Sequence, residues 1–115
     1  MIMKITTEKT AEVLVIHAEG RLDAITAGEF EKEVAPLIQP SGQNVLIDFG
    51  KIDYISSAGL RSMLIIAKEQ KQKGNRLALC CLNETIMEVF RISGFVTIIS
   101  IYPTLEEGLS FLKES

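Results

Sequence analysis

The sequence has no tryptophan, one histidine and two cysteines among its 115 residues. Its longest unbroken apolar run, Leu77 to Leu82, has six residues, whereas a membrane-spanning helix needs about 18 or more. The amino terminus contains no apolar run of signal-peptide length. These absences argue against membrane insertion and secretion, and they predict a cytoplasmic protein.

Basic residues are also few: the chain has 12 lysines and arginines and 15 acidic residues, which gives a net charge of −3. No window holds the five or six consecutive basic residues that would follow a phosphate backbone. Nucleic acid is therefore not an expected partner. A chain of this length forms one domain, residues 1–115, and buries roughly two-thirds of its unfolded surface, so it needs no cofactor or disulfide for stability.

The two cysteines, Cys80 and Cys81, are adjacent in sequence and form no Cys-x-x-Cys motif. Neighbouring residues of a strand point to opposite faces, so these two are not expected to bond to each other. We interpret them as small apolar strand residues in a reducing compartment, with a redox or metal role as the alternative. His17 lies inside the apolar run Val13 to Ala18 and is expected to be an ordinary strand residue. The sequence therefore predicts no metal site.

Short β-branched or apolar segments alternate with stretches of helical periodicity. Strands are expected at Met1 to Thr7, Val13 to His17, Asn44 to Phe49, Arg76 to Leu82 and Val96 to Ile101. The first two should pair as a hairpin across Glu8 to Ala11, and Gly20 should end the second. The central strand, Asn44 to Phe49, is nearly all apolar, as expected where both faces of a sheet are covered.

Helices are expected at Ala27 to Ile38, Ala58 to Lys73, after Asn83 as far as Ser93, and after Thr104 to about Lys113. Thr26 and Glu29 have the spacing of a capping box, and Pro40 should end the first helix. Gly74 provides a left-handed end for the second helix. The alternation of strand and helix indicates an α/β sandwich whose sheet is largely parallel.

Common enzyme motifs are absent from the chain. It contains no Gly-x-Gly-x-x-Gly, no Walker loop and no Gly-x-Ser-x-Gly elbow, and its single histidine is in a predicted strand. Asp48 could be the phosphorylated aspartate of a receiver domain, but the segment Met1 to Glu19 lacks the acidic pair that would hold magnesium. We therefore expect a protein that is not an enzyme.

One segment stands out by its position, Ile52 to Leu60, which joins the central strand to the second helix. Ligands and modifications favour the carboxyl edge of such sheets, and a helix amino terminus stabilises an anion by roughly 0.3–1 kcal/mol. A phosphate on Ser57 would suit this place. The simpler alternative is that Ser57 is only the helix N-cap. Two features argue against that alternative. Ser56 supplies a second hydroxyl where one would suffice. Gly59 weakens the helix relative to alanine, so its presence suggests that another segment approaches closely there.

The segment Asp53 to Leu60 resembles the phosphorylation loop of the STAS domain, in particular of the bacterial anti-sigma factor antagonists. Further motifs match in order: Gly20-Arg21-Leu22-Asp23 followed by Thr26-Ala27, Val45 to Phe49, and Phe90-x-x-Ser93-Gly94-Phe95. The resemblance covers nearly the whole chain. It implies a single α/β domain with a mixed sheet of four to five strands and helices packed mainly on one side.

The resemblance also implies a function in partner switching. In that family an anti-sigma factor that is also a serine kinase phosphorylates the loop, a metal-dependent serine phosphatase reverses this, and the unphosphorylated protein binds the anti-sigma factor and releases the sigma factor. The acceptor aligns with Ser57. Ser56 replaces a common aspartate, so it remains the alternative acceptor. The partner-binding residues so implied are Asp23, Tyr54, Ile55, Ser56, Ser57, Ala58, Gly59 and Leu60, in a monomer or weak dimer.

Two other functions remain open at the level of sequence. The domain could be a docking subunit of another STAS assembly, of the stressosome or lipid-transport kind, which neighbouring genes would distinguish. It could also bind a small molecule or nucleotide at the helix amino terminus. The latter predicts measurable affinity for free nucleotide, whereas a phosphorylation switch predicts little in the absence of the kinase.

Overall fold

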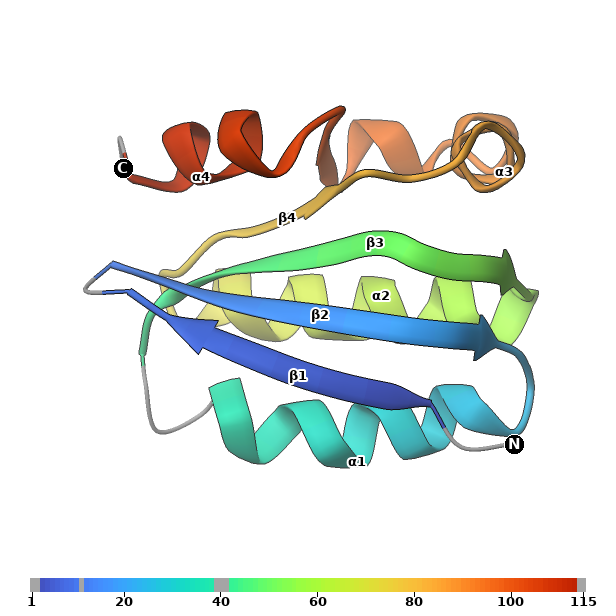
Figure 1. Ribbon diagram of the computed structural model, residues 1–115, viewed down its shortest axis with the longest axis horizontal. Coiled ribbons are helices and arrows are strands. Elements are labelled where there is room, and N and C mark those ends of the chain that lie inside the picture. Colours follow the sequence, from blue (N-terminus) through green and yellow to red (C-terminus); the bar gives the residue numbers. More distant parts are fainter. Residues whose placement is uncertain (1–2, 11, 39–41, 114–115) are drawn as a thin grey trace.

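A five-stranded sheet forms the centre of the molecule in the computed structural model, which describes residues 3–10, 12–38 and 42–113 (Figure 1). The strands are β1 (Lys4–Lys9), β2 (Val13–Leu22), β3 (Asn44–Ile55), β4 (Leu77–Cys80) and β5 (Ser100–Tyr102), and they lie in sequence order across the sheet. β1 pairs antiparallel with β2, and the other three pairings are parallel. The predicted mixed sheet is confirmed.

Helices cover both faces of the sheet, but unequally. They are α1 (Thr26–Ile38), α2 (Ser57–Gln72), α3 (Glu84–Ile92) and α4 (Leu105–Lys113), with a short 3₁₀ helix at Phe95–Thr97. Buried side chains of α1, α2 and α3 share one core cluster with the sheet, whereas Leu112 of α4 belongs to a second cluster on the opposite face. This confirms helices packed mainly on one side.

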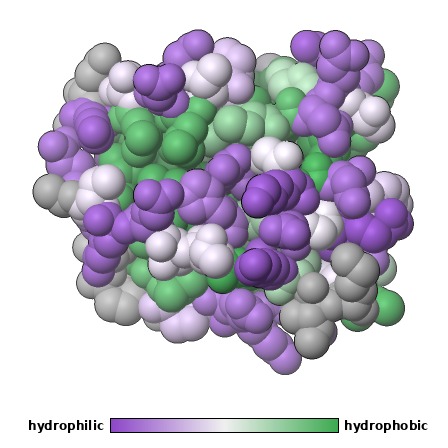
Figure 2. All heavy atoms as spheres, viewed as in Figure 1, coloured by the Kyte–Doolittle hydropathy of each residue, from purple (hydrophilic) through white to green (hydrophobic). Residues whose placement is uncertain are grey.

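The alternation of side chains along β2 and β3 produces these two clusters. In β2, Leu14 and Ile16 face α1, α2 and α3, whereas Val13 and Val15 face α4. Leu46 of β3 joins the α4 side and is fully buried. Hydrophobic side chains gather between α4 and the strands in Figure 2, and hydrophilic ones surround them. The second face is thus covered only in part.

Two strands run further than the sequence predicted. Gly20 does not end β2, because it takes a φ of 125° at a shift in register and the strand continues to Leu22. Likewise β3 does not end at Phe49 but reaches Ile55, which pairs with Leu22. A bulge that needs positive φ explains why a glycine lies inside a strand here. The extension of both strands matters for the site described below.

Other predicted boundaries shift by smaller amounts. β1 reaches Lys9, so the hairpin turn lies later than predicted, with Ala11 outside the described residues. β4 ends at Cys80 because Cys81 adopts a left-handed φ of 65°, which takes it out of the strand. The predicted strand Val96 to Ile101 was wrong in its first half, which forms the 3₁₀ helix.

Helix ends follow the sequence signals closely, with one exception. Gly74 has a φ of 77° after α2, and the Asn83 side chain accepts the Ile86 N–H at the start of α3. The Thr104 hydroxyl accepts the Glu107 N–H before α4.

The exception is Thr26, whose hydroxyl donates to the Arg21 carbonyl at the end of β2 instead of capping α1. Pro40, predicted to end α1, lies outside the described residues.

Candidate functional site

The carboxyl ends of β2 and β3 and the amino ends of α1 and α2 meet at one edge of the molecule (Figure 1). The two strands stay paired to their ends, where Arg21 lies opposite Tyr54. The backbone N–H of Ser56 donates to the Leu22 carbonyl at 2.8 Å, which fixes the start of α2 against the end of β2. The predicted loop between β3 and α2 is therefore a single residue.

Ser56, not Ser57, caps α2. Its backbone is extended, with φ −99° and ψ 176°, and its hydroxyl oxygen accepts the Gly59 N–H at 3.2 Å. Ser57 is the first residue of the helix, and it is exposed while Ser56 is half-buried. The simpler alternative, that Ser57 is only the N-cap of this helix, is therefore wrong. Two adjacent serines are present because one holds the helix end and the other faces solvent.

Asp23 organises the neighbouring start of α1. One carboxylate oxygen accepts the backbone N–H groups of Ile25 and Thr26, each at 2.9 Å. These two hydrogen bonds hold the pKa of Asp23 below its usual value, because they favour the charged carboxylate. Asp23 therefore performs the capping that the sequence assigned to Thr26. It is half-buried and directly follows Leu22, the last residue of β2.

Gly59 lies where α2 comes closest to β2. A Cβ atom at this position would be 2.7 Å from Ile55 Cγ1 and 2.8 Å from the Leu22 carbonyl oxygen. The approaching segment expected from the sequence is thus the end of β2. The absence of a side chain at Gly59 lets the first turn of α2 lie directly on the two strand ends.

The predicted partner-binding residues divide into a surface group and a supporting group. Tyr54 is 40% exposed, and the Arg21 guanidinium stacks on its ring at 4.2 Å. Ser57 is exposed, and Ala58 is half-buried. Ile55, Gly59 and Leu60 are buried beneath them. Ile25, which the sequence did not single out, is 75% exposed near Asp23; an apolar residue between two capping positions was the available signal.

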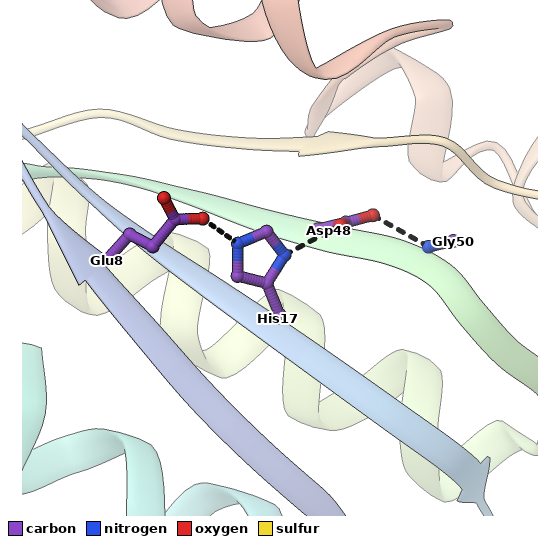
Figure 3. A network of polar contacts seen from close by, with 4 residues as sticks. All are labelled: Glu8, His17, Asp48 and Gly50. Carbon is purple, nitrogen blue, oxygen red and sulfur yellow. Dashed lines mark hydrogen bonds and ion pairs between the residues drawn. The ribbon is translucent and has the colours of Figure 1, made fainter.

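The sole histidine is not beside these serines but lies mid-strand in β2, between two carboxylates (Figure 3). Its Nδ1 is 2.7 Å from Asp48 and its Nε2 is 2.6 Å from Glu8. Partial burial lowers the pKa of His17, but the hydrogen bonds and charges of both carboxylates outweigh it and raise the pKa overall. His17 is thus committed to a polar network on the sheet.

Comparison with known families decides what kind of domain this is. The model of the STAS domain matches residues 4–108. The chain belongs to the STAS domain family. This STAS chain is 36% identical over 111 residues to BtrV of Bordetella bronchiseptica, which is named as an anti-sigma factor antagonist, and the alignment covers 96% of each protein. The membership agrees with the prediction that the chain is not an enzyme.

Solved structures share the STAS fold of this chain. An anti-sigma factor antagonist from Thermotoga maritima has a TM-score of 0.88 at 21% identity, covering 95% of this chain and 94% of its own. The phosphorylated form of the Bacillus cell fate determinant SpoIIAA has a TM-score of 0.70 at 22% identity, covering 93% and 97%. At these identities the likeness establishes the fold alone. Among the described residues of the STAS chain, no helix is long and apolar enough to cross a membrane.

Proposed function

We propose that this STAS domain is an anti-sigma factor antagonist controlled by phosphorylation of Ser57. In its unmodified form it binds an anti-sigma factor that is also a serine kinase, and so releases the sigma factor. A metal-dependent serine phosphatase restores the unmodified form. The observation that carries the proposal is that the two serines at the start of α2 differ: the Ser56 hydroxyl caps the helix, whereas Ser57 is exposed to solvent.

An acceptor serine must be reachable by a kinase, and its oxygen must be free to react. Ser57 meets the first condition because it is exposed at the first helical position. Ser56 is a poorer acceptor because its oxygen is engaged by the Gly59 N–H and its residue is half-buried. Phosphorylation of Ser56 would also remove the cap of α2. The structure therefore favours Ser57 over the alternative that the sequence left open.

The same position explains how a phosphate would act on binding and not on folding. The first N–H groups of a helix have no partner within the helix and favour a nearby anion. A phosphate adds a charge of about −1.5 to −2 that must be desolvated to enter an interface. A penalty of about 3 kcal/mol would weaken binding roughly a hundredfold, because each 1.4 kcal/mol is tenfold.

The surface that the partner would contact is built from both groups of residues. Tyr54, Ser57 and Ala58 present side chains to solvent, with Asp23 and Ser56 at their margin. Ile55, Gly59 and Leu60 hold these residues in place from below. Names of relatives support the choice of partner, since BtrV is described as an anti-sigma factor antagonist and SpoIIAA is known in a phosphorylated form.

The test incubates the protein with candidate kinases of the anti-sigma type and ATP, and locates the phosphate by mass spectrometry. Wild type and Ser56→Ala should be phosphorylated on residue 57, and Ser57→Ala should not be phosphorylated. Ser57→Ala should bind the kinase as tightly as the unmodified wild type. Phosphorylation of Ser57→Ala by the cognate kinase would contradict the assignment.

A charge control separates the site from a general effect of negative charge. Ser57→Asp should lose most of the affinity for the kinase, whereas Ser110→Asp should bind normally, because Ser110 is exposed on α4 at the opposite face of the sheet. Equal loss in both variants would mean that net charge, and not the start of α2, governs binding. Strong affinity for free nucleotide without any kinase would favour a nucleotide-binding module instead.

A further inference from the structure

A row of chemically reactive side chains crosses the sheet away from Ser57. Residues that pair in register point to the same face, and the register pairs His17 of β2 with Asp48 of β3 and Asp48 with Cys80 of β4. This is the face that α4 covers in part, since Cys80 packs in the same cluster as Leu112. The proposed switch does not use any of these residues.

Cys81 turns back toward this row instead of pointing to the opposite face. The expectation that the adjacent cysteines diverge was wrong, because the φ of 65° at Cys81 breaks the alternation of the strand. One carboxylate oxygen of Asp48 and the sulfur atoms of Cys80 and Cys81 all lie within 4.8 Å of one another. Gly50 lies beside the cluster, and a Cβ there would be only 3.0 Å from the Asp48 Oδ1 atom, whereas its 3.7 Å distance to the Cys81 Cβ would be an ordinary contact.

The surrounding contacts hold the three groups in position. Asp48 accepts the Gly50 N–H at 2.8 Å through one oxygen and contacts His17 through the other at 2.7 Å (Figure 3). The backbone N–H of Leu105, the first residue of α4, hydrogen-bonds to the Cys81 sulfur and holds this residue beside α4. Cys80 is fully buried, whereas Asp48 and Cys81 are half-buried and reachable from solvent.

We propose that Asp48, Cys80 and Cys81 form a binding site for a thiophilic divalent cation of the zinc class. Zinc prefers four ligands in tetrahedral arrangement and takes them from thiolates, imidazoles and carboxylates. The chain supplies three, and the partial exposure of Asp48 and Cys81 leaves the fourth position to water. Each thiol loses its proton as its sulfur binds the metal, so the ion exchanges for two protons. Magnesium and calcium are excluded because they select oxygen ligands.

His17 and Glu8 extend the site as positioning residues. A ligating group is commonly held by a hydrogen bond from a further residue, which fixes the orientation of its donor atom. Here His17 holds Asp48, and Glu8 in turn holds His17. A bound ion would join β3 to the end of β4 and would therefore stabilise this face of the sheet independently of the state of Ser57.

The test titrates the reduced, chelator-treated full chain with Cd²⁺ and with Zn²⁺. Cadmium should bind one ion per chain and produce the ultraviolet charge-transfer absorbance of thiolate ligands, and zinc should compete for the same site and raise the melting temperature. Affinity should fall at least about a hundredfold in Cys81→Ser and about tenfold or more in Asp48→Asn. Cys81→Ser changes one atom at a half-buried position, so its fold can be verified by circular dichroism.

Asp53→Asn is the matched control, because it makes the same Asp-to-Asn change at an exposed residue of β3 outside the cluster, and it should bind cadmium close to the wild-type level. Three results would overturn the proposal. These are the absence of the charge-transfer absorbance in the wild type, undiminished affinity in Cys81→Ser, or undiminished affinity in Asp48→Asn. Because these measurements involve no kinase, their outcome is separate from that of the proposed switch.

Discussion

At the scale of single residues, Gly59 sets how closely α2 can approach the strand ends. Replacing it with alanine would place a Cβ 2.7–2.8 Å from Ile55 Cγ1 and from the Leu22 carbonyl oxygen. The carbonyl belongs to a paired strand and cannot move aside. We expect Gly59→Ala to lower the free energy of unfolding by about 1–3 kcal/mol despite the better helix propensity of alanine, as measured by urea denaturation.

Gly28 in α1 offers the matched comparison. It is exposed, and a Cβ there would meet nothing within 4 Å. Gly28→Ala should therefore raise the free energy of unfolding by about 0.4–1 kcal/mol through helix propensity and chain entropy. If both variants changed stability in the same direction, close approach at Gly59 would not be the cause.

The two serines at the start of α2 should differ in stability as well as in phosphorylation. Ser56→Ala removes the oxygen that accepts the Gly59 N–H and should cost about 1 kcal/mol, the usual effect of losing an N-cap. Ser57→Ala removes an exposed hydroxyl at the first helical position and should leave stability within about 0.5 kcal/mol of wild type. Thermal unfolding of both variants measures the difference, and a larger loss in Ser57→Ala would reverse the assignment of the cap.

At the scale of secondary structure, the start of α1 makes stability depend on pH. The pKa of Asp23 is lower in the folded protein than its ordinary value of 3.8, because backbone N–H groups of Thr26 and Ile25 bind the carboxylate. A lowered pKa stabilises the fold above pH 3.8, and this contribution is lost as the pH falls through the folded value. Asp23→Asn keeps a capping oxygen but does not titrate.

We therefore expect wild type to be more stable than Asp23→Asn near neutral pH, with the difference shrinking as the pH falls below 3.8. Urea denaturation at a series of pH values would measure both proteins under the same conditions. A difference that stays constant across this range would show that the charge of Asp23 does not contribute. A difference that grows toward low pH would contradict the direction of the pKa shift.

The sequence predicted which elements exist better than where they end. Asn83, Gly74 and Thr104 act as predicted, because capping depends on neighbouring residues in the chain. The ends of β2 and β3 were wrong, because their extension depends on pairing between segments more than thirty residues apart. Sequence periodicity carries no information on such a register.

In the candidate site, too, features that depend on neighbouring residues could be predicted from the sequence, whereas features that depend on distant segments could not. The pair of serines and the small residues after them could be located from the sequence, but which serine caps α2 depends on a contact between Ser56 and Leu22 of another strand. The sequence left a metal role for the two cysteines only as an alternative and did not place Asp48 beside them, because strand register and the left-handed φ at Cys81 create the cluster. Adjacent cysteines at the end of a short strand were its only sequence signal.

At the scale of the whole molecule, the proposed acceptor lies at the edge of a rigid framework. β2 and β3 stay paired through Leu22 and Ile55, and α2 is fixed to them by its first turn. Three helices cover one face of the sheet and α4 supports the other. A charge added at Ser57 has no buried contact to disrupt, so the fold has no reason to rearrange.

Phosphorylation should consequently change what the protein binds while leaving its structure the same. An anion at a helix amino terminus contributes roughly 0.3–1 kcal/mol, which for a domain of 115 residues corresponds to a rise in melting temperature of no more than about 5 °C. Circular dichroism of the phosphorylated and unmodified proteins should superimpose, while affinity for the anti-sigma kinase falls about a hundredfold. A large fall in melting temperature on phosphorylation would instead indicate a switch that works by unfolding the start of α2.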